Sequence, residues 1–377
     1  MQQDNFDVAI IGGGLAGLSL AIQLASSCRV LLFEKESYPF HKVCGEYISM
    51  ESHGFLERLG IPLTEMALPN ITSLVVTAPD GNELRQQLDL GGFGISRFTL
   101  DDLLQKRARS LGVTIFDQTR VEQVAFANEQ FSISTTKQTY TAKVCCGSFG
   151  KRSNLDLKWK RPFALSPKGR LQNYVGVKYH VRASLARDTI SLHNFPDGYC
   201  GISAIEEDKY CLCYLTRASN LKRAGQSIEV MEKTILSGNP ALRRVFDSVE
   251  KIYDHPETIS QISFEQKSLV EQHVIMLGDA AGMITPLCGN GMSMAMHASL
   301  LLAGEIRHFL EGKISRAGLE SNYTMKWKRQ FHRRLQAGRL IQRFFGKAAV
   351  TNGFIRTMKI FPSLTRLLIR STHGKPF

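Results

Sequence analysis

A glycine-rich turn near the amino terminus is the feature that most constrains the fold of this chain. An apolar run at residues 6–11 leads into a G-x-G-x-x-G pattern, a helical apolar face at 18–25 and a second apolar run that ends at Glu34. The three glycines of the pattern are Gly12, Gly14 and Gly17. This order of strand, turn, helix, strand and acid predicts a dinucleotide-binding, Rossmann-like unit. We expect a pyrophosphate at the amino end of the helix and a ribose hydroxyl on Glu34.

A second glycine-rich turn follows another apolar run, near residue 275. The run ends at Gly278 and Asp279, and the turn Gly289-Asn290-Gly291 opens the next predicted helix. Asp279 suits a sugar hydroxyl because it lies at the carboxyl end of a strand. The free N–H groups at 289–292 would face an anionic ring edge, and a reduced flavin carries negative charge at its N1–C2=O edge. Both turns therefore predict parts of one nucleotide site.

A third motif, R-x-x-x-D-x-x-L, lies on a predicted helix between these turns, at Arg97, Asp101 and Leu104. Together the motifs span residues 12–292 and resemble the FAD-dependent monooxygenase superfamily, which includes aromatic hydroxylases and geranylgeranyl reductases. The resemblance implies that FAD is bound by Gly12, Gly14, Leu15, Ala16, Gly17, Glu34, Lys35, Arg97, Gly278, Asp279, Pro286, Gly289, Asn290, Gly291 and Met292. One departure is Phe149, which replaces the acid of the superfamily's usual G-A-D-G-x-x-S motif.

The predicted fold class is α/β, with a Rossmann-like FAD-binding domain, an interleaved mixed-sheet substrate domain and a C-terminal helical segment. The FAD domain is assigned to 1–75, 96–155 and 270–320, the substrate sheet to 76–95 and 156–269, and a basic helical tail to 321–377. Alternating segments such as YVGVKYHV and YCLCYL predict strands in the substrate sheet. The eight cysteines form no CxxC pair, so we expect reduced thiols and no metal site.

The loop Cys44-Gly45-Glu46 would approach the flavin ring, because in this superfamily the loop after the Glu34 strand does so. A Cys-Gly-acid sequence there resembles the geranylgeranyl reductases. Cys44 is therefore a candidate proton donor, with an unreactive pocket wall or a structural thiol as the alternatives. Glu46 and Tyr199 are the other candidate catalytic residues. In the reductase branch a tryptophan lies near the position of Tyr199, but this chain has Gly201 there, and Tyr199 is equally a candidate core residue.

The resemblance implies an FAD-dependent oxidoreductase in which NAD(P)H serves as a transient reductant. Hydroxylation of a lipophilic phenol, quinone precursor or polyketide is the favoured reaction. Reduction of a C=C bond in an isoprenoid or polyene lipid is the alternative, supported by the Cys-Gly-acid loop. An RNA-associated flavoprotein is a third hypothesis, which the absence of a stacking-aromatic RNA module disfavours.

The net charge of +13 lies entirely in the carboxy-terminal segment. Residues 321–377 contain thirteen Lys or Arg and no Asp or Glu, whereas residues 1–320 contain 34 basic and 34 acidic side chains. Apolar residues at helical spacing accompany the basic ones, so these helices could pack on the protein body, bind anionic lipid headgroups, or bind an acidic carrier or RNA. Without a secretory signal or an apolar run of about 18–20 residues, we expect a cytoplasmic protein, peripheral at most on the inner membrane face.

Overall fold

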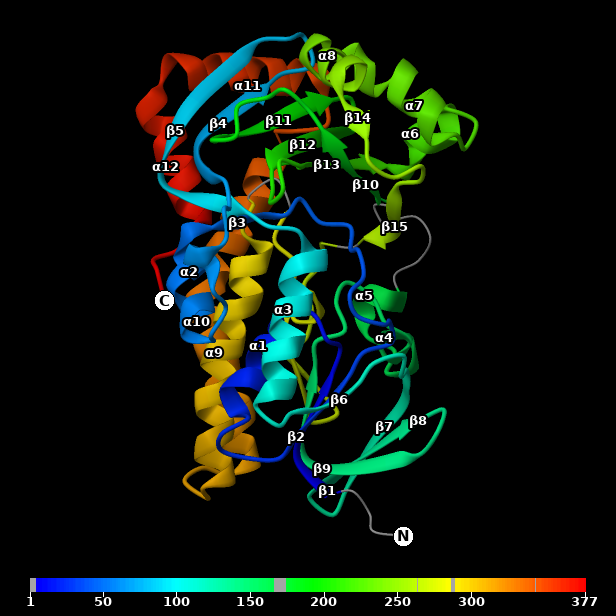
Figure 1. Ribbon diagram of the computed structural model, residues 1–377, viewed down its shortest axis with the longest axis vertical. Helices are drawn as coiled ribbons and strands as arrows, with labels where there is room; N and C mark the ends of the chain where they lie inside the picture. Colours follow the sequence, from blue (N-terminus) through cyan, green and yellow to red (C-terminus); the bar gives the residue numbers. More distant parts are fainter. Residues whose placement is uncertain (1–4, 166–173, 263, 286–288, 343) are drawn as a thin grey trace.

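Two β-sheets, one above the other along the long axis of the molecule, organise the fold (Figure 1). The structure, a computed structural model, describes residues 5–165, 174–262, 264–285, 289–342 and 344–377. Each sheet has helices packed against it, and segments from distant parts of the chain contribute to both sheets.

The first sheet is built around a parallel core. Its main path is β16 (Val270–Glu271), β17 (Val274–Met276), β9 (Thr139–Gly147), β1 (Asn5–Ile11), β2 (Val30–Phe33) and β6 (Thr114–Phe116). An antiparallel hairpin of β7 (Val121–Ala127) and β8 (Gln130–Thr135) joins this path at β9. Strand β2 is buried throughout, which explains its continuous apolar run. The expected strand–turn–helix–strand unit is therefore present.

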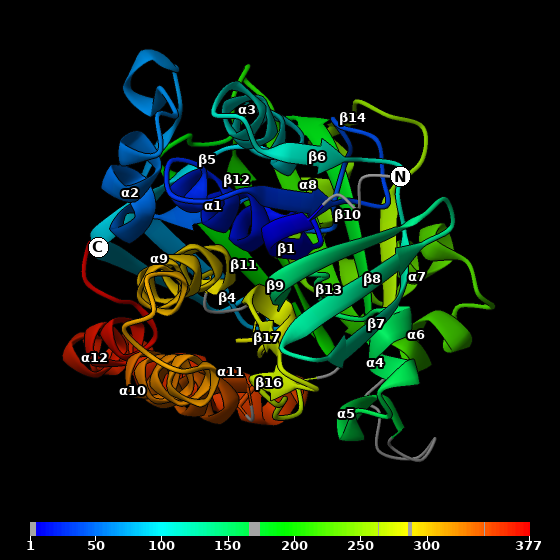
Figure 2. The same cartoon turned by 90° about the horizontal axis from the view of Figure 1, so that it is seen from below.

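Four helices complete this half of the molecule. They are α1 (Leu15–Leu24), α3 (Arg97–Ser110), α9 (Gly291–Leu310) and α10 (Arg316–Gln342). Helix α1 packs against both α3 and α9, and α10 packs outside α9. Figure 2 shows the β7–β8 hairpin on the side of β9 away from α1 and α9. Shorter helices fill the connections: α2 (His53–Arg58), α4 (Asn154–Lys158) and α5 (Pro162–Leu165).

The second sheet is mostly antiparallel. Its path is β14 (Glu250–Lys251), β10 (Tyr174–Arg182), β13 (Tyr210–Arg217), β12 (Gly198–Ala204), β11 (Thr189–Phe195), β4 (Asn70–Thr77), β5 (Glu83–Gly94) and β3 (Tyr47–Ser49), with β15 (Glu257–Ile262) beside β10. The predicted strands YVGVKYHV and YCLCYL are β10 and β13. Two segments assigned from the sequence to the FAD domain, 47–49 and 70–75, belong instead to strands of this sheet.

The two faces of the second sheet have different neighbours. One face packs against α6 (Ala218–Arg223), α7 (Ile228–Thr234) and α8 (Pro240–Ser248) through an apolar cluster that includes Val177, Tyr179 and Tyr214. Because side chains alternate along a strand, Lys178 and Cys213 point to the opposite face, toward the first sheet. The second sheet thus presents polar and sulfur-containing side chains to the FAD-binding half.

The basic C-terminal segment is folded onto the body. In α10 the apolar residues Trp327 and Phe331 are buried, whereas Leu340 near the end of the helix is 50% exposed. Helices α11 (Ala348–Ile360) and α12 (Pro362–Thr372) cover β4 and β5, where Ile355 and Met358 pack in a cluster with residues of these strands. No helix in the described ranges is long and apolar enough to cross a membrane.

Candidate functional site

The glycine turn between β1 and α1 excludes side chains at two of its positions. Gly12 has a φ of +107°, and a Cβ on it would lie 2.5 Å from the carbonyl oxygen of Ser148. A Cβ on Gly17 would lie 2.2 Å from the carbonyl oxygen of Gly12. At Gly14, which precedes α1, no side chain caps the helix. The first N–H groups of α1 are therefore available to an anion that approaches the turn.

Two cations face this turn, and one buried acid holds both of them. The Asp101 carboxylate accepts hydrogen bonds from Arg97 Nε at 2.8 Å, Arg97 Nη2 at 2.7 Å and Lys42 Nζ at 2.9 Å. A Cβ built on Gly14 would lie 3.6 Å from Arg97 Nη2 and 3.7 Å from Lys42 Nζ. Burial would raise the pKa of Asp101, but the charges of Arg97 and Lys42 lower it overall. The acid therefore remains ionised and keeps both cations beside the turn.

Sequence reasoning predicted Arg97 as a cofactor residue but missed Lys42. Lys42 and Asp101 are 59 positions apart, so no local spacing links them. The one available signal was the position of Lys42 in the loop that also carries Cys44. With Lys42 included, the turn has a helix amino end and two side-chain cations, which fits a pyrophosphate.

The acid at the end of β2 is already directed at the glycine turn. Glu34 is buried, and its Oε2 accepts a hydrogen bond from Gly13 N at 2.9 Å. Leu15 and Ala16 are buried in α1, so they could contact a cofactor only through their backbone. Lys35 is more than half exposed and pairs with Glu36 at 3.3 Å. The structure thus places Glu34 at the turn and Lys35 in solvent.

The turn after β17 is held in place by two buried cations. Lys267 Nζ donates to the carbonyl oxygen of Asp279 at 2.7 Å, and Arg161 Nη2 donates to that of Ala280 at 3.0 Å. Burial lowers the pKa of Lys267 to about 8. These two hydrogen bonds fix the backbone of the turn that carries Asp279. Neither cation was predicted from the sequence.

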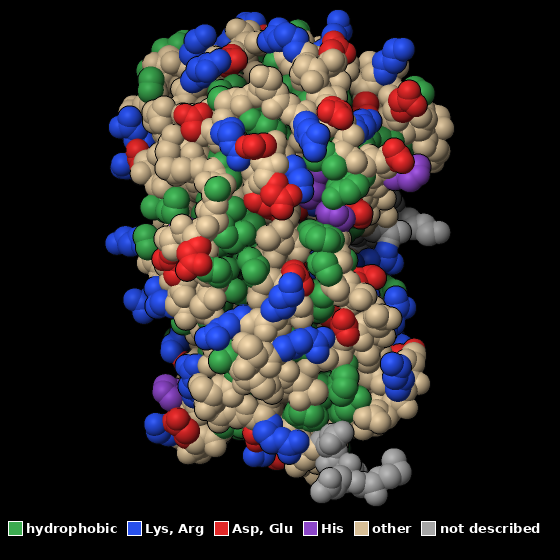
Figure 3. Space-filling model, in the orientation of Figure 1, with side chains coloured by type: hydrophobic (Ala, Val, Ile, Leu, Met, Phe, Trp, Pro, Cys, Tyr) green, Lys and Arg blue, Asp and Glu red, His purple; other side chains and the backbone are tan. Residues whose placement is uncertain are grey.

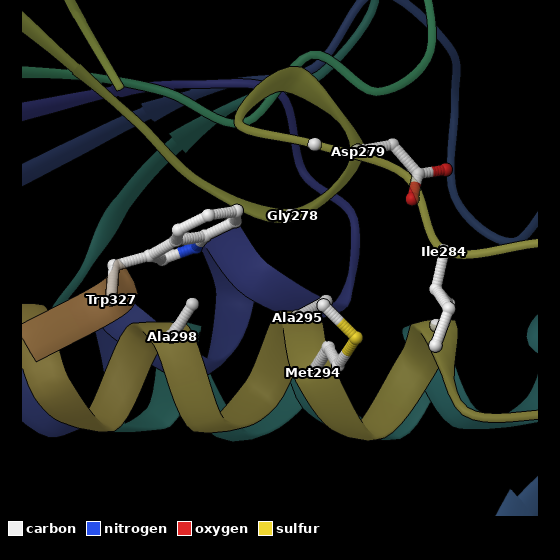
Figure 4. A pocket seen from close by; sticks show the side chains of 9 residues that line it. Gly278, Asp279, Ile284, Met294, Ala295, Ala298 and Trp327 are labelled. Carbon is white, nitrogen blue, oxygen red and sulfur yellow. The ribbon is translucent and has the colours of Figure 1, made fainter. Parts of the chain in front are cut away.

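Figure 4 shows a small cavity beside this turn. Its volume is about 10 Å³, which is room for about one water molecule. Residues from the turn, from α9 and from α10 line it: Gly278, Asp279, Gly282, Ile284, Gly291, Met294, Ala295, Ala298 and Trp327. The cavity shows that Asp279 and the first turns of α9 share one surface. Pro286, predicted to bind FAD, lies outside the described residues.

The predicted turn at the start of α9 is also present. Gly289 has a φ of +63°, and a Cβ on it would lie 3.1 Å from the ring of Tyr47. Asn290 is buried and donates from Nδ2 to the carbonyl oxygen of Thr372 at 2.7 Å. The hydroxyl of Ser293 is buried and has no hydrogen-bond partner among the described residues. A buried hydroxyl without a partner at a helix amino end suits a polar ligand.

Cys44 lies against this helix end. Its Sγ is 3.5 Å from Sδ of Met292, in the first turn of α9. The carbonyl oxygen of Cys44 accepts a hydrogen bond from Sγ of Cys211 at 3.2 Å, which ties the loop to β13. The structure therefore brings together two predicted residues, Cys44 and Met292, that are 248 positions apart.

Glu46 has a different position from that expected of a catalytic acid. Its side chain is fully buried, and it accepts hydrogen bonds from Lys178 Nζ at 2.5 Å, His180 Nε2 at 2.6 Å and Arg97 N at 2.9 Å. Burial would raise the pKa of Glu46, but His180 and Lys178 lower it overall. Both oxygens are engaged, so Glu46 is suited to fixing the loop against β10. Lys178 and His180 were not predicted from the sequence.

Tyr199 and Phe149 both pack among apolar side chains. Tyr199 is half-buried on β12, in a cluster with Leu215 and with Met283 of the loop that follows Asp279. It therefore faces the FAD-binding half, as a substrate contact would, while also packing in a core. Phe149 lies against the ring of Trp159, with their centroids 6.2 Å apart, and occupies the expected acid's position with an apolar ring.

Comparisons with known proteins show which protein family this chain resembles. A family described as an FAD binding domain matches residues 5–159, the segment that contains the glycine turn, Glu34, Lys42 and Arg97. Its relatives include flavin-dependent halogenases and geranylgeranyl reductases, and the latter are one of the groups that the motif order resembled. The residues at the turn fit FAD, because the space that a Cβ would fill at Gly14 lies between two cations and a helix amino end. The chain is an FAD-dependent oxidoreductase.

Relatives of this FAD-dependent oxidoreductase cover most of its length. An uncharacterised protein of Methanosarcina barkeri is 25% identical over 90% of this chain and 84% of its own. Digeranylgeranylglycerophospholipid reductase 2 of Methanopyrus kandleri is 25% identical over 86% of this chain and 83% of its own. The flavin-dependent brominase Bmp2 shares the fold, with a TM-score of 0.78 and 20% identity over 98% of this chain and 93% of its own.

Replacing Arg97 by methionine should weaken FAD binding about 10- to 150-fold, because a hydrogen bond to a charged group contributes roughly 1.5–3 kcal/mol. Asp101 would keep Lys42 as a partner, so the fold should survive. Fluorescence titration of the apoprotein with FAD measures the change. Lys106→Met, on the same helix but mostly exposed, is the matched control and should bind FAD as the wild type does. An unchanged affinity in Arg97→Met would contradict this role.

Proposed function

We propose that this FAD-dependent oxidoreductase reduces an isolated C=C bond in an apolar substrate of the isoprenoid or polyene lipid class. The observation that carries the proposal is the sulfur-lined end of α9. There the Cys44 thiol lies 3.5 Å from the Met292 thioether, and the Cys211 thiol donates a hydrogen bond to the carbonyl oxygen of Cys44. This is the helix end that the superfamily resemblance assigns to the flavin.

The redox sensitivity of these groups favours a reductase. Thiols are oxidised to sulfenic acids and thioethers to sulfoxides by the reactive oxygen species that hydroxylating or halogenating enzymes generate. Cys44 is partly accessible rather than sealed in the core, so burial does not protect it. A site that holds a thiol and a thioether in contact at the reacting edge is better suited to hydride transfer than to oxygen transfer.

Cys44 would act as the proton donor in this reaction. When bound and reduced by NAD(P)H, FAD would supply a hydride equivalent for one carbon of the double bond. Sγ of Cys44 would give its proton to the other carbon, so that one C=C π bond is replaced by two C–H bonds. The remaining thiolate regains a proton from solvent between turnovers. Glu46, Lys178 and His180 would position the loop without touching the substrate.

Named relatives are consistent with this proposal. The Methanopyrus kandleri relative, whose name describes a reductase of a digeranylgeranyl lipid, aligns with most of this chain. A second relative with the same type of name, from Methanococcus vannielii, is 23% identical over 88% of this chain. An apolar polyprenyl substrate would also suit the cluster of Tyr199, Leu215 and Met283, which faces the FAD-binding half.

Hydroxylation or halogenation of an aromatic ring is the second candidate. Hydroxylation is the reaction that the sequence favoured, and the fold shared with the brominase Bmp2 is the observation that supports oxidative chemistry. Anaerobic turnover of the NAD(P)H-reduced enzyme with polyprenyl lipids and with phenols separates the candidates by mass spectrometry. Products that gain two hydrogens without O₂ support the reductase, whereas products that gain oxygen or halogen only when O₂ is present would overturn it.

Replacing Cys44 by alanine should lower substrate reduction about 10²- to 10⁴-fold, the usual contribution of a positioned proton donor. The reduction of FAD by NAD(P)H should be unchanged, because that half-reaction does not use the thiol. Stopped-flow absorbance follows the flavin, and product analysis follows the substrate. Cys213→Ala, on the neighbouring β13, is the matched control and should retain turnover within a few-fold. If Cys44→Ala turns over normally, the thiol is not the donor.

A further inference from the structure

The corner where α11 meets α12 exposes a group of large apolar side chains. We call it the α11–α12 corner and define it by four residues: Ile360, Phe361, Leu364 and Leu367. Their exposed fractions are 70%, 53%, 40% and 63%. Leu364 and Leu367 are three positions apart and share a face of α12, Ile360 ends α11, and Phe361 lies at the bend between the two helices. The four exposed apolar residues are thus gathered within eight positions of the chain, at the bend between the two helices.

The opposite sides of both helices are packed, which fixes the corner in this orientation. Ile355 and Met358 of α11 are buried in the cluster with Val76 and Leu84 of the second sheet. Thr365 of α12 is buried and donates from Oγ1 to the carbonyl oxygen of Met358 at 2.9 Å. Rotating either helix to hide the corner would expose these contacts. The apolar surface is thus a stable feature of the folded chain.

Basic side chains surround the corner. Lys359, Arg366 and Arg370 are exposed next to it, and Figure 3 shows basic side chains along the margin of the molecule where α10 and α12 lie. Two acids of the β4–β5 hairpin offset part of this charge: Asp89 pairs with Arg370 at 2.6 Å and with Arg366 at 3.8 Å, and Asp80 pairs with Arg356 at 2.8 Å. Lys359 has no acidic partner in the parts of the chain that the structure describes. The segment 321–377 contributes no acid of its own.

We propose that the α11–α12 corner inserts into the headgroup region of an anionic lipid bilayer. Exposed apolar side chains flanked by Lys and Arg around the corner of two helices match the chemistry of such an interface, where the apolar groups enter the acyl boundary and the cations meet lipid phosphates. The side chains project separately around a bend, which suits insertion into a fluid layer better than packing into a rigid protein groove. This proposal goes beyond the reaction and does not depend on which substrate is reduced.

Helix α12 connects this surface to the flavin site. Its last residue, Thr372, accepts the hydrogen bond from Asn290 in the turn that opens α9. The helix has 11 residues, so at about 1.5 Å per residue the corner and the turn are separated by roughly 16 Å along it. A substrate dissolved in the bilayer would therefore meet the enzyme a short distance from the site, and the docked helix would contact the flavin loop directly.

Co-sedimentation of the FAD-loaded full chain with vesicles tests the proposal. We expect binding to phosphatidylcholine vesicles that contain phosphatidylglycerol, weaker binding to phosphatidylcholine alone, and release at high salt. Ile360→Ser with Leu367→Ser should reduce binding at least tenfold, and Lys359→Gln with Arg366→Gln should remove the preference for the anionic lipid. Val230→Ser on α7, where the side chain is 45% exposed, is the matched control and should bind as the wild type does.

Folding of each variant is checked by FAD content and thermal midpoint, which should match the wild type because the corner residues are exposed. Lack of wild-type binding to anionic vesicles would overturn the proposal, as would unchanged binding of the Ile360→Ser, Leu367→Ser variant. Binding to a polyglutamate peptide but to no vesicle would overturn it in favour of an acidic protein partner. Because sedimentation needs no turnover, these outcomes are independent of the reaction proposed above.

Discussion

Replacing Lys178 by methionine is expected to lower the free energy of unfolding by about 3–5 kcal/mol, the usual effect of removing one partner from a buried ion pair. Lys178 and Glu46 are both buried, and their charged atoms are 2.5 Å apart. Without the ammonium group, the Glu46 carboxylate would remain buried, and among the described residues His180 would be its remaining side-chain partner. Chemical denaturation followed by circular dichroism measures the loss.

The Lys178→Met substitution should also change how the free energy of unfolding depends on pH. The pKa of Glu46 is lowered in the folded protein, so its contribution is fully present above the unfolded value, near 4.5, and is lost as the pH falls below that value. In Lys178→Met the folded pKa rises, so acid destabilisation should begin at higher pH. Adding Glu46→Gln should recover part of the lost stability, because it removes the unpaired charge.

An exposed ion pair provides the control for this prediction. Lys143 and Asp7 are 2.9 Å apart, but the lysine side chain is 57% exposed. Lys143→Met should therefore change the free energy of unfolding by less than about 1 kcal/mol. If Lys178→Met is no more destabilising than Lys143→Met, the buried cluster does not hold the loop as we infer.

Replacing Gly12 by alanine is expected to abolish tight FAD binding and to cost about 2–5 kcal/mol of folding free energy. Roughly 1–2 kcal/mol would come from the positive φ, which disfavours a residue with a Cβ. The remainder, about 1–3 kcal/mol, would come from overlap with backbone atoms of Ser148 and Phe149, 2.5–2.7 Å from the added Cβ. Because these neighbours are backbone atoms, relief requires the turn itself to move away from its pyrophosphate-binding geometry.

Gly304→Ala is the matched control for Gly12→Ala. Gly304 lies inside α9 with nothing within 4 Å of an added Cβ, so alanine should be neutral or stabilise the helix by up to about 1 kcal/mol. Thermal unfolding of the apoprotein and titration with FAD give the two quantities for each variant. Normal FAD affinity in Gly12→Ala would show that the turn is not the pyrophosphate site.

The amino-acid sequence by itself determined the parts of the site that are encoded in short windows. The strand, glycine turn, helix and acid at residues 6–34 are neighbours along the chain, and Gly12 and Gly17 each meet a steric demand of the turn that they form. The same holds for the turn that opens α9. Such motifs are readable because their geometry depends on adjacent residues and backbone conformation, with little influence from the rest of the chain.

Tertiary structure decided which distant side chains complete the site. Lys42 reaches the glycine turn only because Asp101 on α3 holds it, and Glu46 became a positioning group because β10 presents Lys178 and His180 to it across 132 and 134 positions. The boundary between the two halves also differs from the one assigned from the sequence. Residues 47–49 and 70–75 pair with β5 and so belong to the second sheet. These contacts depend on strand register and on how the two sheets face each other, which long-range packing sets and local sequence patterns do not encode.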